Sequence, residues 1–345
     1  MSRDAGTPSG RSDGGTSVAI EDMLHIRQHT ILKRLFASQA FWVMVALIII
    51  CVAMSIAEPP FHSEENFYNI TRNFALVGMM SLGMTVVIIT GGIDLSVGST
   101  MGVVAVASGL MLQEGSSWIL AGVVALGAGA IVGVINGVLI AYIGLSPFVV
   151  TLGMLSAARS AAVVLSRNRM LYQFGDGGPT FKAIGAGAVL GIANPVWFMV
   201  ILTVLMALVL RFTAWGRHMF AIGGNEHAAT LTGVPVKRLK LQAYVVCSLT
   251  AAISGILTVG WAGSAINAMG TGYELRAIAS AVIGGANLMG GEGGMFGAFI
   301  GSALIEVIRN SLLMAGVDSN WQGLFVGLFI VAAVLLERIR GRRRE

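Results

Sequence analysis

Long apolar runs separated by short polar stretches recur along the whole chain. A helix needs about 20 predominantly apolar residues to cross the hydrocarbon core of a bilayer, and about ten runs approach that length. We therefore predict an all-α, polytopic transmembrane bundle of about ten spans. Two of these runs, 98–112 and 276–289, are short enough to be half-helices or tilted pieces. The predicted spans are 41–57, 73–90, 98–112, 118–142, 147–165, 195–212, 243–262, 276–289, 294–314 and 321–337.

The basic residues predict the orientation of this bundle, because Lys and Arg are enriched in cytoplasmic loops. An even number of spans places both termini on one side, together with the basic connection 213–242. The connection 58–72, which contains three glutamates, then lies on the opposite side. Both termini are therefore predicted to be cytoplasmic, although three basic residues fall on the outer side: Arg167, Arg169 and Lys182.

The polar ends of the chain divide it into three parts. Residues 1–30 lack apolar periodicity and are predicted to form a disordered cytoplasmic tail. Residues 31–337 form the transmembrane domain, and 338–345 form a basic cytoplasmic tail. The first apolar run starts only at Phe41, which does not fit a cleavable signal peptide, so the first helix is expected to be retained.

The composition excludes several classes of function. With 55% hydrophobic and 11% charged residues, the chain does not fit a soluble domain, and its net charge of +5 is explained by cytoplasmic loops rather than by nucleic-acid binding. The glycine-rich strings lack the Lys and Ser or Thr of a Walker A loop. The 2 cysteines and 5 histidines lack metal-ligand spacing. We therefore expect no enzyme activity and no cofactor or metal on this chain. The 46 glycines, many of them within apolar runs, indicate closely packed membrane helices.

The most unusual motif is the string 91–98, GGIDLSVG, which places Asp94 between two spans. A carboxylate near the membrane interior is costly and is usually paired, faces a cavity or is functional. Two interpretations remain open: Asp94 lines a polar cavity at a broken helix, or it caps the following helix in an ordinary turn. The string 284–288, GGANL, is a weak internal echo of this motif.

The connection 213–242 contains a second candidate site. Asn225 is placed to cap a short helix, and Gly233 followed by Pro235 ends it. Ala228, Ala229 and Leu231 would give this helix a small apolar face. Such a helix either docks to a partner protein or lies against the bilayer or its own bundle, and the spacing alone does not separate these alternatives.

Within the predicted spans a few polar groups stand out. Glu306 and Arg309 lie three residues apart on one helical face and are expected to neutralise each other. The amides of Asn136 and Asn287 could bind a hydroxylated solute or bridge helices by hydrogen bonds.

Four strings together resemble a known family, the membrane-spanning permeases of ribose-type bacterial ABC sugar importers, which are related to branched-chain amino-acid permeases. They are TGGIDLSVGS (90–99), SPFVVTLGM (146–154), GGNEHAATLTGV (223–234) and AVIGG (281–285). They stand in the order expected of that family, and the resemblance covers roughly 42–336. It implies a type II importer-like permease in the bacterial inner membrane.

The resemblance also implies how the chain would function. A soluble periplasmic binding protein would deliver a monosaccharide, and a second permease copy or paralogue would complete the pathway. Cytoplasmic ATPase subunits, which hold ATP and Mg, would supply the energy. The implied ATPase-coupling residues are Gly224, Asn225, Glu226, Ala228, Ala229, Gly233 and Val234. Our candidates for the substrate pathway are Asp94, Ser96, Asn136, Thr151 and Asn287.

The rival interpretation is a stand-alone secondary transporter or channel for a small polar solute, which would also contain many spans and broken helices. Such a protein would transport its solute without an ATPase.

Overall fold

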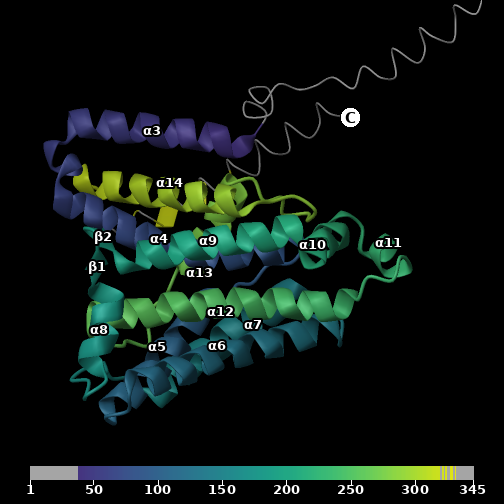
Figure 1. Ribbon diagram of the computed structural model, residues 1–345, viewed down its shortest axis with the longest axis horizontal. Helices are drawn as coiled ribbons and strands as arrows, with labels where there is room; N and C mark the ends of the chain where they lie inside the picture. The colour runs from purple at the N-terminus through teal and green to yellow at the C-terminus, as the bar shows by residue number, and fades with distance from the viewer. Residues whose placement is uncertain (1–37, 319–320, 322, 325–326, 329–330, 332–345) are drawn as a thin grey trace, which may run out of the picture.

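The computed structural model describes residues 38–318, 321, 323–324, 327–328 and 331. This part of the chain is a bundle of long helices that run roughly alongside one another (Figure 1). Seven of the described helices are long and apolar enough to cross a membrane, and α5 is slightly shorter. The long helices are α3 (Gln39–Ala57), α4 (Glu64–Ile89), α5 (Val97–Gln113), α6 (Trp118–Ala141), α7 (Pro147–Leu165), α9 (Asn194–Phe212), α12 (Val236–Ala262) and α14 (Met295–Met314).

Short elements occupy the two ends of this bundle and part of its interior. The hairpin of β1 and β2 lies with α8 at one end, called the α8 end below, whereas α10 and α11 lie at the opposite, α11 end (Figure 1). The sequence did not predict α8 or the hairpin. The short elements are η1 (Pro59–His62), α8 (Gly178–Ala186), β1 (Ala188–Val189), β2 (Ile192–Ala193), α10 (Ala214–Gly224), α11 (Glu226–Leu231) and α13 (Tyr273–Ile283).

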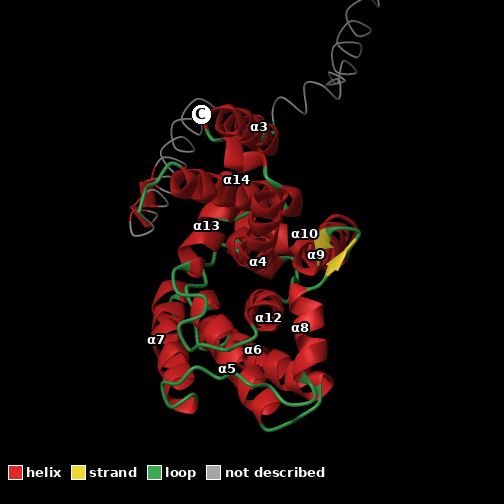
Figure 2. Ribbon diagram, turned by 90° about the vertical axis from the view of Figure 1, so that its left-hand side faces the viewer, coloured by secondary structure: helices red, strands yellow, loops and turns green. Residues whose placement is uncertain are grey.

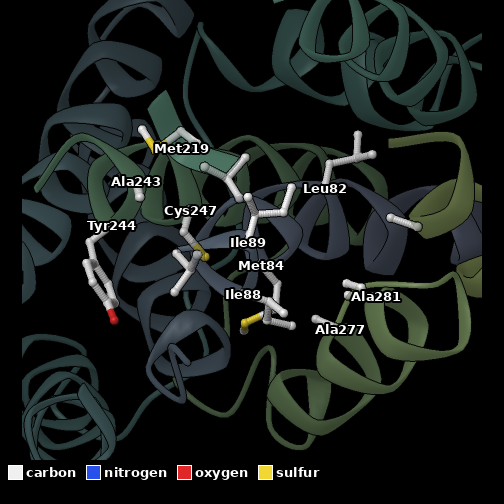
Figure 3. Packing of buried hydrophobic residues seen from close by; sticks show 14 of the residues in the cluster. Leu82, Met84, Ile88, Ile89, Met219, Ala243, Tyr244, Cys247, Ala277 and Ala281 are labelled. Atoms are coloured by element: carbon white, nitrogen blue, oxygen red, sulfur yellow. The ribbon is translucent and has the colours of Figure 1, made fainter. Parts of the chain in front are cut away.

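Helix α4 is the central element of the bundle, and it packs against α9, α12, α13 and α14. In its most apolar 18-residue stretch 94% of the residues are buried, whereas the corresponding stretch of α3 contains no fully buried residue. Figure 2 shows α3 at the edge of the bundle, beside α14. In the core, Ile88 of α4, Cys247 of α12 and Ala277 of α13 belong to one buried cluster (Figure 3). Helix α4 is therefore surrounded by protein, and α3 leaves most of its apolar surface for lipid.

Glycines allow α6 to pack closely against α12, as the sequence predicted. A Cβ at Gly133 would lie 2.7 Å from the Cα of Val245, and one at Gly137 would lie 2.8 Å from the Cα of Leu241. In a bilayer, such close approach provides the van der Waals contact that holds helices together.

Three predicted boundaries were wrong. The stretch 58–72 is not a single connection, because α4 begins at Glu64 and Ser63 caps it by accepting a hydrogen bond from the amide of Asn66. Helix α12 begins at Val236 rather than at 243. The predicted run 276–289 is helical only as far as Ile283. The predicted tails 1–30 and 338–345, and most of the predicted span 321–337, lie outside the described residues.

Candidate functional site

A buried polar cluster surrounds Asp94, in the turn between α4 and α5. One carboxylate oxygen, Oδ1, accepts hydrogen bonds from the backbone amide of Ser96 at 2.8 Å and from its hydroxyl at 2.6 Å. The Ser96 hydroxyl in turn accepts a hydrogen bond from Nδ2 of Asn136 on α6, at 2.9 Å. Asp94 thus organises the turn before α5, and Asn136 ties that turn to α6.

The cluster is sealed inside the protein in this conformation. The side chains of Asp94, Ser96 and Asn136 are all 0% exposed. Asp94 Oδ2, Asn136 Oδ1 and the Tyr244 hydroxyl have no hydrogen-bond partner among the described residues. Unsatisfied polar atoms in a protein interior are costly, and in native proteins they often mark the site of an ordered water or a functional role. A solute could touch these atoms only if the α4–α5 turn or the helices around it moved.

The remaining predicted pathway residues divide into two locations. Thr151 on α7 adjoins the cluster, because its hydroxyl lies 3.3 Å from the carbonyl oxygen of Ile93 and 2.9 Å from that of Pro147. Asn287 lies elsewhere, in the loop between α13 and α14, and its Oδ1 accepts a hydrogen bond from the amide of Met289 at 2.8 Å. The structure therefore brings Thr151 to the Asp94 turn, and the hydrogen bonds of Asn287 belong to a different turn.

The weak internal echo corresponds to a repeated local structure. After α4, the amides of Gly91 and Gly92 donate to the carbonyls of Ile88 and Val87, and after α13 the amides of Gly285 and Ala286 donate to those of Val282 and Ala281. Both patterns are Schellman helix ends, which require a left-handed residue. That residue is Gly91 (φ 77°) in the first copy and Gly285 (φ 104°) in the second. Each helix end is then followed by a turn in which Asp94 or Asn287 accepts the amide two residues ahead.

Sequence reasoning assigned no role to an arginine that fastens a loop across the bundle. Nη1 of Arg159 on α7 donates to the carbonyls of Asn267 and, at 2.9 Å, Met269. These carbonyls belong to the loop before α13. The start of α13, which follows this loop, lies against α5, because a Cβ added to Gly98 of α5 would meet the carboxylate of Glu274, the second residue of α13. An isolated charge within an apolar run was the signal that could have pointed to Arg159, but nothing in the sequence indicated its partners.

The predicted ion pair within α14 is confirmed. Arg309 Nη2 lies 2.6 Å from Glu306 Oε1, and the Glu306 side chain is only 2% exposed. Pairing lowers the cost of placing these two charges inside the bundle.

The predicted short helix near Asn225 is also confirmed. Oδ1 of Asn225 accepts the amide of Ala228 at 2.9 Å, which caps α11, and the left-handed Gly233 (φ 83°) follows the helix. Glu226 in the first turn forms an ion pair with Lys240 of α12 at 2.5 Å. Most of the predicted connection 213–242 is therefore helical, and an ion pair links α11 to α12.

The predicted apolar face of α11 is wrong in detail. Ala229 is only 4% exposed and packs into the bundle, whereas Ala228 is exposed and Leu231 is 76% exposed. Neighbouring positions on an α-helix point about 100° apart, so Ala228 and Ala229 cannot face the same way. Val234 also packs against the core, whereas Gly224 and Gly233 lie at the surface. Every residue of α11 except Ala229 is exposed, and Ala228 and Leu231 are the apolar ones among them.

Comparison with known proteins identifies the family of this chain. Residues 66–334 match the family described as branched-chain amino acid transport system / permease component. The "Probable ABC transporter permease protein y4mJ" of Sinorhizobium fredii is 39% identical and covers 87% of this chain and 89% of its own length.

Two further relatives have transported solutes in their names. The ribose import permease protein RbsC of Escherichia coli K12 is 34% identical over 85% of this chain and 92% of its own length. The autoinducer 2 import system permease protein LsrD of Salmonella paratyphi B is 33% identical over 80% and 84%, respectively. The chain therefore belongs to the branched-chain amino acid transport system permease family, and it is a multi-pass membrane subunit of an ABC transporter rather than an enzyme.

Proposed function

We propose that this chain is the membrane subunit of an importer that carries a monosaccharide or a sugar-like solute across the bacterial inner membrane. The relatives named above are import permeases for ribose and for autoinducer 2, and their similarity extends over most of this chain. A periplasmic binding protein would deliver the solute. ATP and Mg would be held by separate ATPase subunits, and this chain would bind no cofactor of its own.

The observation that carries this proposal is the structure of α11. It is a capped, ion-paired helix that projects from the bundle end and presents Ala228 and Leu231 outward. A groove of about 710 Å³ lies beside it, bordered by α11, the start of α12 and the turn after α6. A rigid projection next to a groove is suited to docking into another protein. We infer that α11 is the coupling helix that contacts the ATPase.

The orientation follows from the same assignment. The α11 end would be cytoplasmic, in agreement with the basic residues Arg217, Lys237 and Arg238 near α11. Both termini would then be cytoplasmic, with a tenth span in 321–337 and polar tails at 1–30 and 338–345. This arrangement corresponds to a type II importer-like permease.

A second permease copy or a paralogue would complete the pathway. The exposed side of α7 carries the small residues Gly153, Ser156, Ala157 and Ser160. Small residues on a lipid-facing side allow another helix to approach closely, so α7 is our candidate for the contact between the two permeases.

The Asp94 cluster would border this pathway from within. Asp94, Ser96, Asn136 and Thr151 would become accessible only while the α4–α5 turn moves. Asn287 would contribute from the equivalent turn after α13.

Assembly with the ATPase tests the coupling assignment. We expect Leu231→Asp to abolish co-purification of the cognate ATPase, because it places a charge at an exposed apolar contact. The matched control is Leu190→Asp, which changes an even more exposed leucine (87%) at the α8 end and should leave assembly intact. Unchanged ATPase binding by Leu231→Asp would overturn the assignment of α11.

A further inference from the structure

At the α11 end, three segments of backbone meet with no side chain between them. They are the end of α4, the end of α10 and the loop between α13 and α14. The amide of Gly291 in that loop donates to the carbonyl of Ile89 at the end of α4, at 2.9 Å. A Cβ added to Gly223, near the end of α10, would overlap both the carbonyl oxygen of Ile89 and the amide nitrogen of Gly291. Only glycine fits at Gly223 without moving one of the other two segments.

The same junction brings the two echoed turns into contact. Gly290 has a left-handed φ of 92°, and a Cβ at this position would lie 2.9 Å from the carbonyl oxygen of Gly223 and 3.0 Å from the amide nitrogen of Gly91. Gly91 is the left-handed residue that ends α4, just before the Asp94 turn. The end of α10 therefore touches the loop that leads into α14 and lies directly beside the turn that leads into α5.

This junction is closely connected to α11. Helix α10 ends at Gly224, and the next residue, Asn225, caps α11. On its inner side, α10 is anchored by Met219 and Ile222, which are buried in the same core cluster as Ile89. Figure 3 labels Met219 and Ile89 among the side chains of this cluster. A displacement of α11 must therefore either bend the chain at Gly224 and Asn225 or move the end of α10.

Backbone contacts are suited to passing on such a displacement. Close-packed interiors have low compressibility and transmit strain, whereas a long side chain can change rotamer and absorb it. Here the contacting atoms are carbonyl oxygens, amide nitrogens and Cα atoms, which cannot rotate away.

We propose that Gly223 is a positioning residue for transport, at which movement of the coupling helix passes to both echoed turns and so to α5 and α14 together. This inference rests on the proposed function, since it takes α11 as the contact with the ATPase. It also gives a role to the echo, because each copy supplies a glycine turn that receives the same displacement.

The first test crowds the junction in the complete importer, reconstituted with its ATPase and binding protein. Gly223→Ala should still bind the ATPase and hydrolyse ATP, but solute uptake per ATP should fall about tenfold or more, which is within the usual range of coupling between sites. The matched control is Gly294→Ala in the same loop, where a Cβ meets nothing within 4 Å. Normal uptake per ATP by Gly223→Ala would overturn the inference.

A second test does not depend on how well Gly223→Ala assembles. A fluorophore on Met289→Cys, in a background with Cys51→Ala and Cys247→Ala, reports on the loop next to the junction, since Met289 is 85% exposed. ATP should change its emission in the otherwise unaltered importer, ADP should not, and Leu231→Asp should abolish the response. An ATP response of zero in an importer that transports normally would contradict the relay.

These outcomes separate the inference from the proposed function. If the unaltered importer fails to couple uptake to ATP hydrolysis, the proposed function fails. If it couples normally, and Gly223→Ala does so as well, only the role of Gly223 fails.

Discussion

Removing the carboxylate of Asp94 should destabilise the protein more than its position in a turn suggests. Asp94→Ala deletes the acceptor of two short hydrogen bonds, from the amide and the hydroxyl of Ser96. A hydrogen bond contributes about 1 kcal/mol when its acceptor is neutral and about 1.5–3 kcal/mol when its acceptor is charged, so the loss of both amounts to roughly 2–6 kcal/mol. Removal of the buried carboxyl group relieves its desolvation cost and offsets part of this loss, and we expect a net loss of about 2–4 kcal/mol.

Asp94→Asn should separate the two possible reasons for such a loss. The amide keeps an acceptor at Oδ1, which receives both Ser96 hydrogen bonds, and its NH₂ group replaces Oδ2, an atom that has no hydrogen-bond partner among the described residues. Because the amide retains the acceptor that Asp94→Ala removes, we expect Asp94→Asn to lose less than half as much stability as Asp94→Ala.

Thermal unfolding in detergent measures these differences, and uptake kinetics show their functional effect. Asp176→Ala, which removes an exposed carboxylate, is the control and should leave the melting temperature unchanged. For Asp94→Asn we expect a lower maximal uptake rate with little change in KM, because the side chain does not contact solute in the closed turn. A melting temperature of Asp94→Ala equal to that of Asp176→Ala would refute the stabilising role of the cluster.

Three further variants test other parts of the structure. Arg309→Met should cost about 3–5 kcal/mol in unfolding experiments by leaving Glu306 buried and unpaired, and adding Glu306→Gln should restore most of that loss. Gly133→Ala should lower the free energy of unfolding by about 1–3 kcal/mol, and with it the melting temperature, because its Cβ meets the α12 backbone. Its control is Gly122→Ala, whose Cβ meets nothing within 4 Å and which should leave the melting temperature unchanged. Asn225→Ala removes the cap of α11, worth about 1 kcal/mol, and should weaken ATPase binding about fivefold. Equal effects of Gly133→Ala and Gly122→Ala would contradict the close packing of α6 against α12. Unchanged ATPase affinity of the Asn225→Ala variant would contradict the assignment of α11 as the ATPase contact.

The sequence predicted most helices because lipid exposure imposes long apolar runs. It misplaced the start of α4, since only the middle of a membrane helix must be apolar and its first turn carries Glu64 and Glu65. It also extended the run at 276–289 too far. Glycines lie both within helices, as Gly133 does, and at helix ends, as Gly285 does, so a glycine alone does not show which role it has.

The candidate sites were predicted only as far as local chemistry determines them. Asn225 could be predicted as a cap because the interaction spans three residues. Which side of α11 would be buried could not be predicted, because that depends on where the bundle lies relative to Ala229. The enclosure of Asp94 and the backbone contact of Gly223 with Ile89 likewise arise from segments far apart in the sequence.

Uptake by proteoliposomes tests the central claim most directly. The purified chain would be reconstituted alone, with its ATPase, and with both the ATPase and the binding protein, and radiolabelled ribose and autoinducer 2 would be the test solutes. We predict accumulation of one of these, or of a related sugar, only when the ATPase, the binding protein and ATP are all present. Solute transport by the chain alone would contradict this claim and identify a stand-alone transporter or channel.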